Sequence, residues 1–335
     1  MKGKLAKKRF LSMQPRLEGL RAIPGRRALR QRRTRAGLAL LMLLLAAMFV
    51  LPLFVPYGYA QIITVDGQRD RGAKNLAPFA YSEMEQEAMA RGESVFPHIF
   101  GTDELCRDYF VRVMYGARVS LLTGVVATLV VLVIGSIYGA VAGYAGGKAD
   151  LLMMRAVDLI YALPDTLMVV LFSVVLDTTL MDALAGTALA KLGSNLLSLF
   201  IVFGALYWVG MARLVRARVL SLKKDEYVLA ARALGAGPVR ILRRHILPGC
   251  APVVLAAAAM QVPSAIFTES FLSFIGLGVQ APMPSLGSLA NAARGAMGSF
   301  PHKLVFPAVA LCLIVLAFDL ISDGLRAALD PRAER

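Results

Sequence analysis

Long apolar stretches without charge alternate with short charged segments along this chain of 335 residues. A bilayer core about 30 Å thick needs roughly 20 apolar residues to be crossed by one helix. Six stretches approach that length, and Asp319 and Asp323 mark the inner end of the last one. They cover residues 36–57, 119–147, 156–176, 192–212, 246–268 and 304–325. The pattern therefore predicts an all-α integral membrane protein with six transmembrane helices.

The first apolar stretch follows a basic segment, as the apolar part of a secretory signal peptide would. Gly58, Tyr59 and Ala60 also loosely resemble a cleavage site. The apolar part of a signal peptide spans about 7–15 residues, whereas residues 36–56 are all uncharged. The length therefore predicts a retained membrane anchor.

The distribution of lysine and arginine predicts the orientation, because cytoplasmic segments of membrane proteins are enriched in both. Residues 1–35 hold 13 of these basic residues and one acid, Glu18, whereas residues 57–108 hold five basic and nine acidic residues. The segment 213–245 holds nine basic residues against two acids. We therefore expect residues 1–35, the segment 213–245 and the carboxyl terminus in the cytoplasm.

The formal net charge of +15 has a second reading, since basic segments also bind nucleic acid. Six arginines stand close together between Arg26 and Arg35. Phe10 is the only aromatic residue before the first span, so the stacking platform of single-strand binders is missing. Basic charge beside a membrane anchor explains the same residues, and we expect no nucleic-acid partner.

Motifs for catalysis, cofactors and metals are missing from the sequence. A phosphate cradle of the type GxxxxGK[ST] does not occur, because Ala149 follows Gly147 and Lys148 where Ser or Thr is needed. The three cysteines and three histidines form no CxxC or HExxH spacing. We expect no catalytic, cofactor-binding or metal-binding residues, and an energy source that is another protein or an ion gradient.

Three acidic residues lie in or beside expected spans, where ionisable groups are rare and often functional. A structural interpretation is available for each. Asp158 can pair with Arg155 or cap a turn, and Asp165 follows Pro164 at a helix break. Glu269 ends the fifth apolar stretch, where a structural role and a substrate contact both remain open.

The segment 225–248, DEYVLAARALGAGPVRILRRHILP, is unlike a simple connecting loop. Tyr227 to Leu234 favours helix, whereas Gly235, Gly237 and Pro238 interrupt it, and helical spacing resumes from Val239. The pattern predicts a short helix on the inner membrane face. Its small side chains allow a partner to approach closely, and its arginines can pair with acidic groups or lipid headgroups.

This segment resembles the cytoplasmic EAA loop of ABC-importer permeases, whose pattern is EAA, three residues, Gly, nine residues and I-x-L-P. Two positions depart from it, since Leu229 stands where the family has Glu and His245 where it has Ile. The resemblance implies that Glu226, one turn earlier, or the apolar face contacts the ATPase. The matching residues are Ala230, Ala231, Gly235, Leu247 and Pro248.

Four further blocks resemble the second permease subunit of dipeptide, oligopeptide and nickel importers. One departure is Cys106, which replaces a usual Gly, a residue that would permit backbone angles less suited to Cys. The blocks are FGTDELCRDYFVRVMYGARVSL at 100–121, VDLIYALPDTL at 157–167, ESFLSFIGLGVQAPMPSLG at 269–287 and DGLRAALDPR at 323–332.

The resemblance implies a type I ABC-importer permease fold in the bacterial cell (inner) membrane, with both termini cytoplasmic. The expected regions are a basic tail at 1–35, a first transmembrane helix at 36–57, an extracytoplasmic loop at 58–112, a five-helix permease core at 113–325 with a coupling loop at 213–248, and a carboxyl terminus at 326–335. The loop at 58–112 is long enough for a role in receptor docking, although a merely solvated face also explains its acidic residues.

The implied partners are a homologous permease subunit, two ATP-binding subunits, an extracytoplasmic substrate-binding protein and membrane lipid. The implied cargo is a peptide, with nickel as the alternative within the family. A stand-alone secondary carrier is the alternative from another class. It would leave the cytoplasmic helix without a partner, and the spans hold little of the charge that such carriers need.

Overall fold

The structure, a computed structural model, describes residues 31–184, 194–279 and 283–329. Its elements in chain order are α3 (Arg32–Val50), η1 (Leu51–Leu53), β1 (Thr64–Val65), β2 (Gln68–Arg69), α4 (Glu83–Ala90), α5 (Tyr109–Ala145), α6 (Gly147–Tyr161), α7 (Asp165–Leu184), α8 (Ser194–Val202), the π-helical turn η3 (Phe203–Tyr207), α9 (Trp208–Leu222), α10 (Glu226–Ala233), α11 (Pro238–Ile241), the π-helical turn η4 (Leu242–Ile246), α12 (Leu247–Phe274), α13 (Leu286–Arg294) and α14 (His302–Leu329).

Five helices in the described ranges are long and apolar enough to cross a membrane. Each contains all or most of one expected stretch, so the all-α membrane architecture is confirmed. The helices are Arg32–Leu53, Tyr109–Ala145, Leu196–Leu222, Pro238–Phe274 and His302–Ala328.

The third expected span, 156–176, is not one helix. α6 ends at Tyr161 and α7 begins at Asp165, and a turn separates them. Pro164 explains the break, because its ring disfavours helical angles in the residue before it. The apolar helix described after the break, Leu167–Leu176, is shorter than the other five. The counterpart of the third span is therefore α7, which extends to Leu184.

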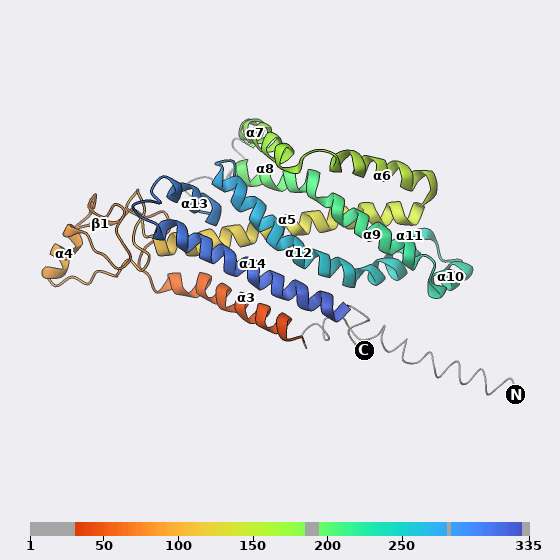
Figure 1. The fold of residues 1–335 in the computed structure, drawn as a ribbon, viewed down its shortest axis with the longest axis horizontal. Helices are drawn as coiled ribbons and strands as arrows, with labels where there is room; N and C mark the ends of the chain where they lie inside the picture. Colours follow the sequence, from red (N-terminus) through yellow and green to blue (C-terminus); the bar gives the residue numbers. More distant parts are fainter. Residues whose placement is uncertain (1–30, 185–193, 280–282, 330–335) are drawn as a thin grey trace.

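The long helices lie side by side in an elongated bundle with two different ends (Figure 1). α4 and β1 lie at one end, and α10 and α11 lie at the other. The start of α3 and the end of α14 also lie toward the α10 end. The segments 58–108 and 223–241 are thus separated by the length of the bundle, as the alternating charge pattern predicts.

α5 and α9 form the closest contact in the bundle core. Gly135, Gly139 and Gly143 follow one another at intervals of one turn on α5 and face α9. A Cβ atom at these positions would lie 2.8, 2.3 and 2.9 Å from backbone carbonyl oxygens of α9. Only glycine permits this approach, which is the close helix contact that small residues allow in membranes.

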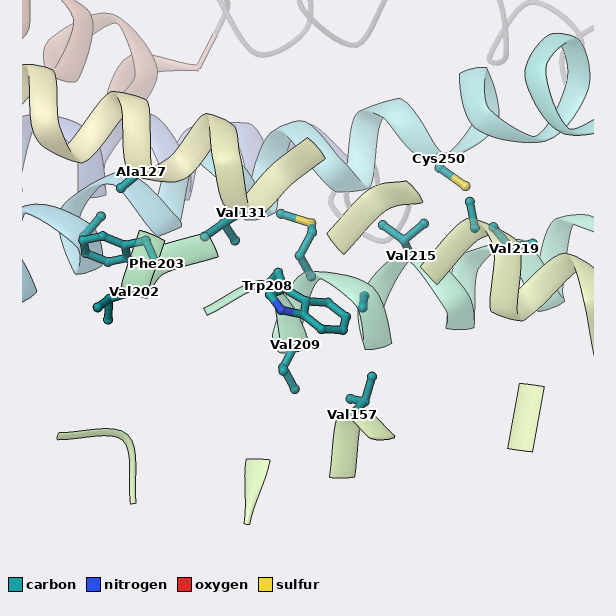
Figure 2. Close-up of a cluster of buried hydrophobic side chains, with 14 of the residues drawn as sticks. Ala127, Val131, Val157, Val202, Phe203, Trp208, Val209, Val215, Val219 and Cys250 are labelled. Carbon is teal, nitrogen blue, oxygen red and sulfur yellow. The ribbon is translucent and has the colours of Figure 1, made fainter. Parts of the chain in front are cut away.

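A large cluster of buried apolar side chains extends along this contact (Figure 2). Val131 of α5 and Trp208 of α9 belong to it, together with Val157 of α6 and Cys250 of α12. Four helices therefore share one packed core.

The segment between η1 and α5, here called the end cap (residues 54–108), has little regular structure. Its two short strands pair antiparallel, with Thr64 opposite Arg69 and Val65 opposite Gln68. Asp66 and Gly67 between them have φ of 52° and 74°, as a type I′ hairpin turn requires.

Cys106 in the end cap has a φ of 61°, in the left-handed region. The usual Gly at this position would adopt that angle at lower cost, as expected from the sequence. The Cys106 side chain is buried in a small apolar cluster with Ile63 and Ala73, so burial of the thiol offsets part of the backbone cost.

A buried histidine joins the end cap to α5. His98 is fully buried, with Nδ1 2.9 Å from Asp108 Oδ2 and Nε2 2.9 Å from Glu85 Oε1. Asp108 is the N-cap of α5, and Glu85 completes a capping box with Ser82 at the start of α4. One imidazole therefore holds the first turns of two helices together.

The two carboxylates determine the charge of His98. Burial lowers the pKa of His98, but its hydrogen bonds to Asp108 and Glu85 and their charges outweigh burial and raise the pKa to about 9. His98 is consequently protonated at neutral pH, and both ring nitrogens donate to carboxylates.

We expect the end cap to lose stability as pH rises from about 6.5 through about 9. The folded pKa lies above the ordinary value of 6.5, so the contribution of His98 is complete below 6.5 and disappears as the imidazole deprotonates. The rate of proteolysis within the end cap, measured across this range, reports the loss. His98→Gln should destabilise the cap by about 3 kcal/mol near neutral pH and remove the pH dependence. His245→Gln is the control and should retain it, and an unchanged pH profile in His98→Gln would contradict the assignment.

Candidate functional site

The short helix α10 ends in a defined turn at Gly235. Gly235 donates its N–H to the carbonyl of Arg232, and Ala236 donates to that of Ala231, at 3.0 Å each. These two bonds form a Schellman motif, which needs a left-handed residue at its centre. Gly235 has a φ of 83°, and a Cβ atom there would meet nothing within 4 Å. The requirement for glycine at this position is therefore one of backbone conformation and not of space.

Helix resumes directly after this turn. Gly237 is extended, and Pro238 takes the first position of α11, where its missing N–H costs no hydrogen bond. From Pro238 the helix continues through η4 into α12 without interruption. The predicted order of helix, turn and helix is thus present, and the second helix is the start of a membrane span.

A buried side chain holds α10 against the bundle. Val228 is fully buried in the core cluster, together with Ile241 of α11 and Ile246 of η4. Tyr227 donates from its hydroxyl to the carbonyl oxygen of His245 at 3.4 Å. Residues on both sides of the Gly235 turn therefore pack together.

Three large apolar side chains on and just after α10 are exposed. Leu229 of α10 is 49% exposed, Leu234 at its C-cap 88% and Val239 of α11 68%. Such large apolar side chains around one short helix are typical of a surface that a partner covers.

The six residues expected at the coupling site lie on α10, in the turn that ends it, and at the start of α12. Glu226, Ala230 and Gly235 are exposed, whereas Ala231 is half-buried. Leu247 and Pro248 begin α12, the former half-buried against the core and the latter exposed. Glu226 and the apolar Leu229 are both accessible, so a partner can use either of them.

Two contacts just before α10 were not expected from the sequence. The guanidinium of Arg216 donates to both carboxylate oxygens of Asp150, at 2.6 and 2.7 Å. Lys223 donates to the carbonyl oxygen of Tyr144 at 2.6 Å. They tie the end of α9 to α5 and α6. The acid and the arginine are separated by 66 residues, and only the helix break at Gly146 hints that Asp150 lies near the bundle end.

Asp158 pairs with Arg213 of α9. One interpretation of the sequence, a pair with Arg155, is therefore wrong. The carboxylate oxygen lies 2.6 Å from the Arg213 guanidinium. The guanidinium also stacks over the ring of Tyr161, 4.3 Å from its centre. Asp158 of α6 and Arg213 of α9 are 55 residues apart in the chain, so local spacing cannot indicate the pair. Asp165 begins α7 directly after the break, as expected.

Glu269 is completely buried among hydroxyl groups. Ser120 of α5 donates to it at 2.7 Å and Ser273 at 2.8 Å, and Ser270 donates at 3.3 Å. Ser120 also accepts the N–H of Leu286 at the start of α13. A carboxylate with this many donors is satisfied internally, so the structure favours the structural role that the sequence left open.

A family model described as the inner membrane component of binding-protein-dependent transport systems matches residues 135–335. The chain belongs to that family. The match begins within α5 and includes the whole of α10 and the helix that follows it. The coupling-site residues therefore lie in the part that characterises binding-protein-dependent transport components, whereas the end cap precedes it.

Similar proteins carry related names. The oligopeptide transport system permease protein OppC of Bacillus subtilis (strain 168) is 42% identical over 238 residues, 71% of this chain and 73% of that protein. The dipeptide transport system permease protein DppC of the same strain is 44% identical over 239 residues, 71% and 70% of the two chains. A putative peptide permease of Brucella suis biovar 1 is 38% identical over 322 residues, 96% and 94%. The resemblance to the second permease subunit of this branch is confirmed.

We expect Gly235→Val to abolish uptake by this family member while leaving its abundance in the membrane unchanged. A β-branched residue in the left-handed conformation costs about 1–2 kcal/mol, enough to open the turn that orients α10 but too little to unfold the bundle. Immunoblotting of membranes and an uptake assay measure the two effects.

Gly235→Asn is the matched control, because Asn tolerates left-handed angles and the position is open in space. It should retain most of the uptake. Normal uptake by Gly235→Val would refute a role for the turn.

Proposed function

We propose that this chain is the permease subunit of an ATP-driven importer of peptides and forms half of its translocation path. The observation that carries the proposal is α10, a short helix anchored by Val228 with an exposed apolar face at one end of the bundle. A helix held in this way can transmit the movement of a partner to the spans that follow it.

The partner proposed for α10 is a separate ATPase. The chain has no phosphate cradle of its own, so ATP would be hydrolysed elsewhere. Leu229 and Leu234 would enter an apolar cleft, and Glu226 would remain available for a basic group on its rim. Four exposed arginines surround the site and can pair with acidic groups of the ATPase or with lipid headgroups, namely Arg232, Arg240, Arg243 and Arg244.

Peptides are the proposed cargo because the relatives are named for oligopeptide, dipeptide and peptide transport. A homologous permease subunit would complete the path, with two ATP-binding subunits below. A substrate-binding protein would deliver peptides at the end cap. Delivery at the end cap requires that the cap lies outside the cell membrane. α10 and both termini then lie in the cytoplasm of a bacterial cell.

Reconstitution tests the proposed division of labour. This chain alone in proteoliposomes should take up no peptide. The complex with the second permease, the ATPases and the binding protein should take up peptide when ATP is present on the side of the membrane where the ATPases lie. Gly235→Val should assemble less ATPase or lose the stimulation of ATP hydrolysis by substrate. Uptake by the lone chain under a proton or sodium gradient would indicate a secondary carrier, and uptake of Ni²⁺ in place of peptide would redirect the cargo assignment.

Cysteine labelling tests the orientation. In a background without the three native cysteines, Gln61→Cys and Glu87→Cys should react with an impermeant thiol reagent added to intact spheroplasts, because both positions are exposed on the end cap. Lys224→Cys, exposed beside α10, should react only after the membrane is opened. Labelling of Lys224→Cys in closed spheroplasts would contradict the proposed orientation.

A further inference from the structure

One exposed face of α12 carries polar groups along with aromatic rings. Ser264 and the rings of Phe267 and Phe271 are exposed, and Gln261 and Thr268 are half-buried at its edges. We call this face the α12 stripe and define it as Met260, Gln261, Ser264, Phe267, Thr268 and Phe271.

Contacts between α5 and α12 give the depth of the stripe. Ser120 of α5 bonds Glu269, and a Cβ atom at Gly124 would lie 2.2 Å from the side chain of Ile266. This antiparallel alignment puts Gln261 level with about residue 129 of α5. That level is about 16 Å, or eleven residues at 1.5 Å each, beyond Arg118, the last charged residue before the apolar part of α5. The stripe therefore begins at the outer boundary and reaches the middle of the bilayer.

The exposed face of α5 provides a contrast at the same depth. Its exposed residues there are aliphatic, and Leu122 and Leu129 are 64% and 55% exposed. Such a face suits lipid tails. The Thr268 hydroxyl donates to the carbonyl oxygen of Ser264 at 3.0 Å and needs no further acceptor. The amide of Gln261 and the hydroxyl of Ser264 would be poorly solvated by hydrocarbon, so the α12 stripe faces water or protein.

Two hollows flank the aromatic rings of the stripe. A hollow of about 310 Å³ lies between Phe267 and Phe271 and the side chains of Val169 and Tyr207. A second hollow of about 210 Å³ lies on the other side of the same two rings, against α13 and α14. The first hollow reaches the lower limit of about 300 Å³ for small-ligand pockets, and the second is smaller. Hollows beside the rings distinguish the stripe from a face that packs flat against another helix.

We propose that the α12 stripe lines the passage for the transported molecule. Phe267 and Phe271 contact its side chains, and the neutral polar groups of Gln261, Ser264 and Thr268 exchange hydrogen bonds with main-chain amides. The stripe residues carry no charge, so they accept peptides whose side chains differ in charge. The identity of the cargo rests on the proposed import of peptides, whereas the position of the passage does not.

Thiol accessibility in the assembled transporter tests the proposal. Ser264→Cys and Phe267→Cys are compared with Leu122→Cys, which matches Phe267 in depth, and with the deeper Leu129→Cys on α5. All are made in the cysteine-free background, whose uptake is measured separately. A charged, impermeant methanethiosulfonate reacts only with thiolate in contact with water. The stripe cysteines should react at least about tenfold faster, since each unit of raised pKa in hydrocarbon lowers the thiolate fraction tenfold. A tripeptide in excess should slow that reaction.

The remaining outcomes overturn the proposal. If an apolar maleimide labels Ser264→Cys but the charged reagent does not, the stripe faces lipid. If neither reagent reacts and a cysteine of the second permease crosslinks to it, the stripe is a dry subunit interface. A wrong cargo gives a result that differs from both of these. The charged reagent then reacts at the stripe, but peptides neither protect it nor are taken up.

Discussion

The close contact between α5 and α9 is the interaction on which the arrangement of the other elements depends. Gly135, Gly139 and Gly143 let the two backbones meet with no side chain between them. Apolar burial gives helices no driving force to associate within lipid, so such packing must supply it. α9 leads directly to α10, and the paired charges of Arg216 and Asp150 secure the end of α9 next to α10. The position of α10 therefore follows from a helix contact in the half of the bundle next to it.

Satisfaction of polar groups shapes the half of the bundle next to the end cap. Glu269 points to the interior face of α12, where hydroxyls from α5 and from α12 itself surround it. Ser264 lies on the exposed face of the same helix. One helix thus has a polar group that hydroxyls satisfy inside the protein and another that is exposed on the surface of this chain. The contrast distinguishes a structural carboxylate from the wall of a path.

The sequence allowed the local features to be predicted and left the long-range pairs unknown. Apolar length indicated the spans, and the glycines and proline around Gly235 indicated the turn of α10, because both depend on neighbouring residues. The third span was misplaced, since apolar residues continue on both sides of Pro164 and the expected stretch was drawn across the break that this proline indicated. The Arg216 to Asp150 pair and the His98 network join residues distant in the chain or buried in an irregular segment, where no periodicity brings them together. The pairing of Asp158 with Arg213 was not predicted for the same reason.

The continuous helix from Pro238 to Phe274 connects the two proposed sites. Its 37 residues extend about 55 Å at 1.5 Å per residue, from the turn at Gly235 to the aromatic rings of the α12 stripe. The helix is not uniform, because η4 has π-helical bonding and Pro252 and Pro263 each remove a backbone donor. Bending concentrates at such points and the intervening turns move as rigid pieces. Pro263 directly precedes Ser264, so a displacement of α10 would change the direction of the helix where the proposed passage lies.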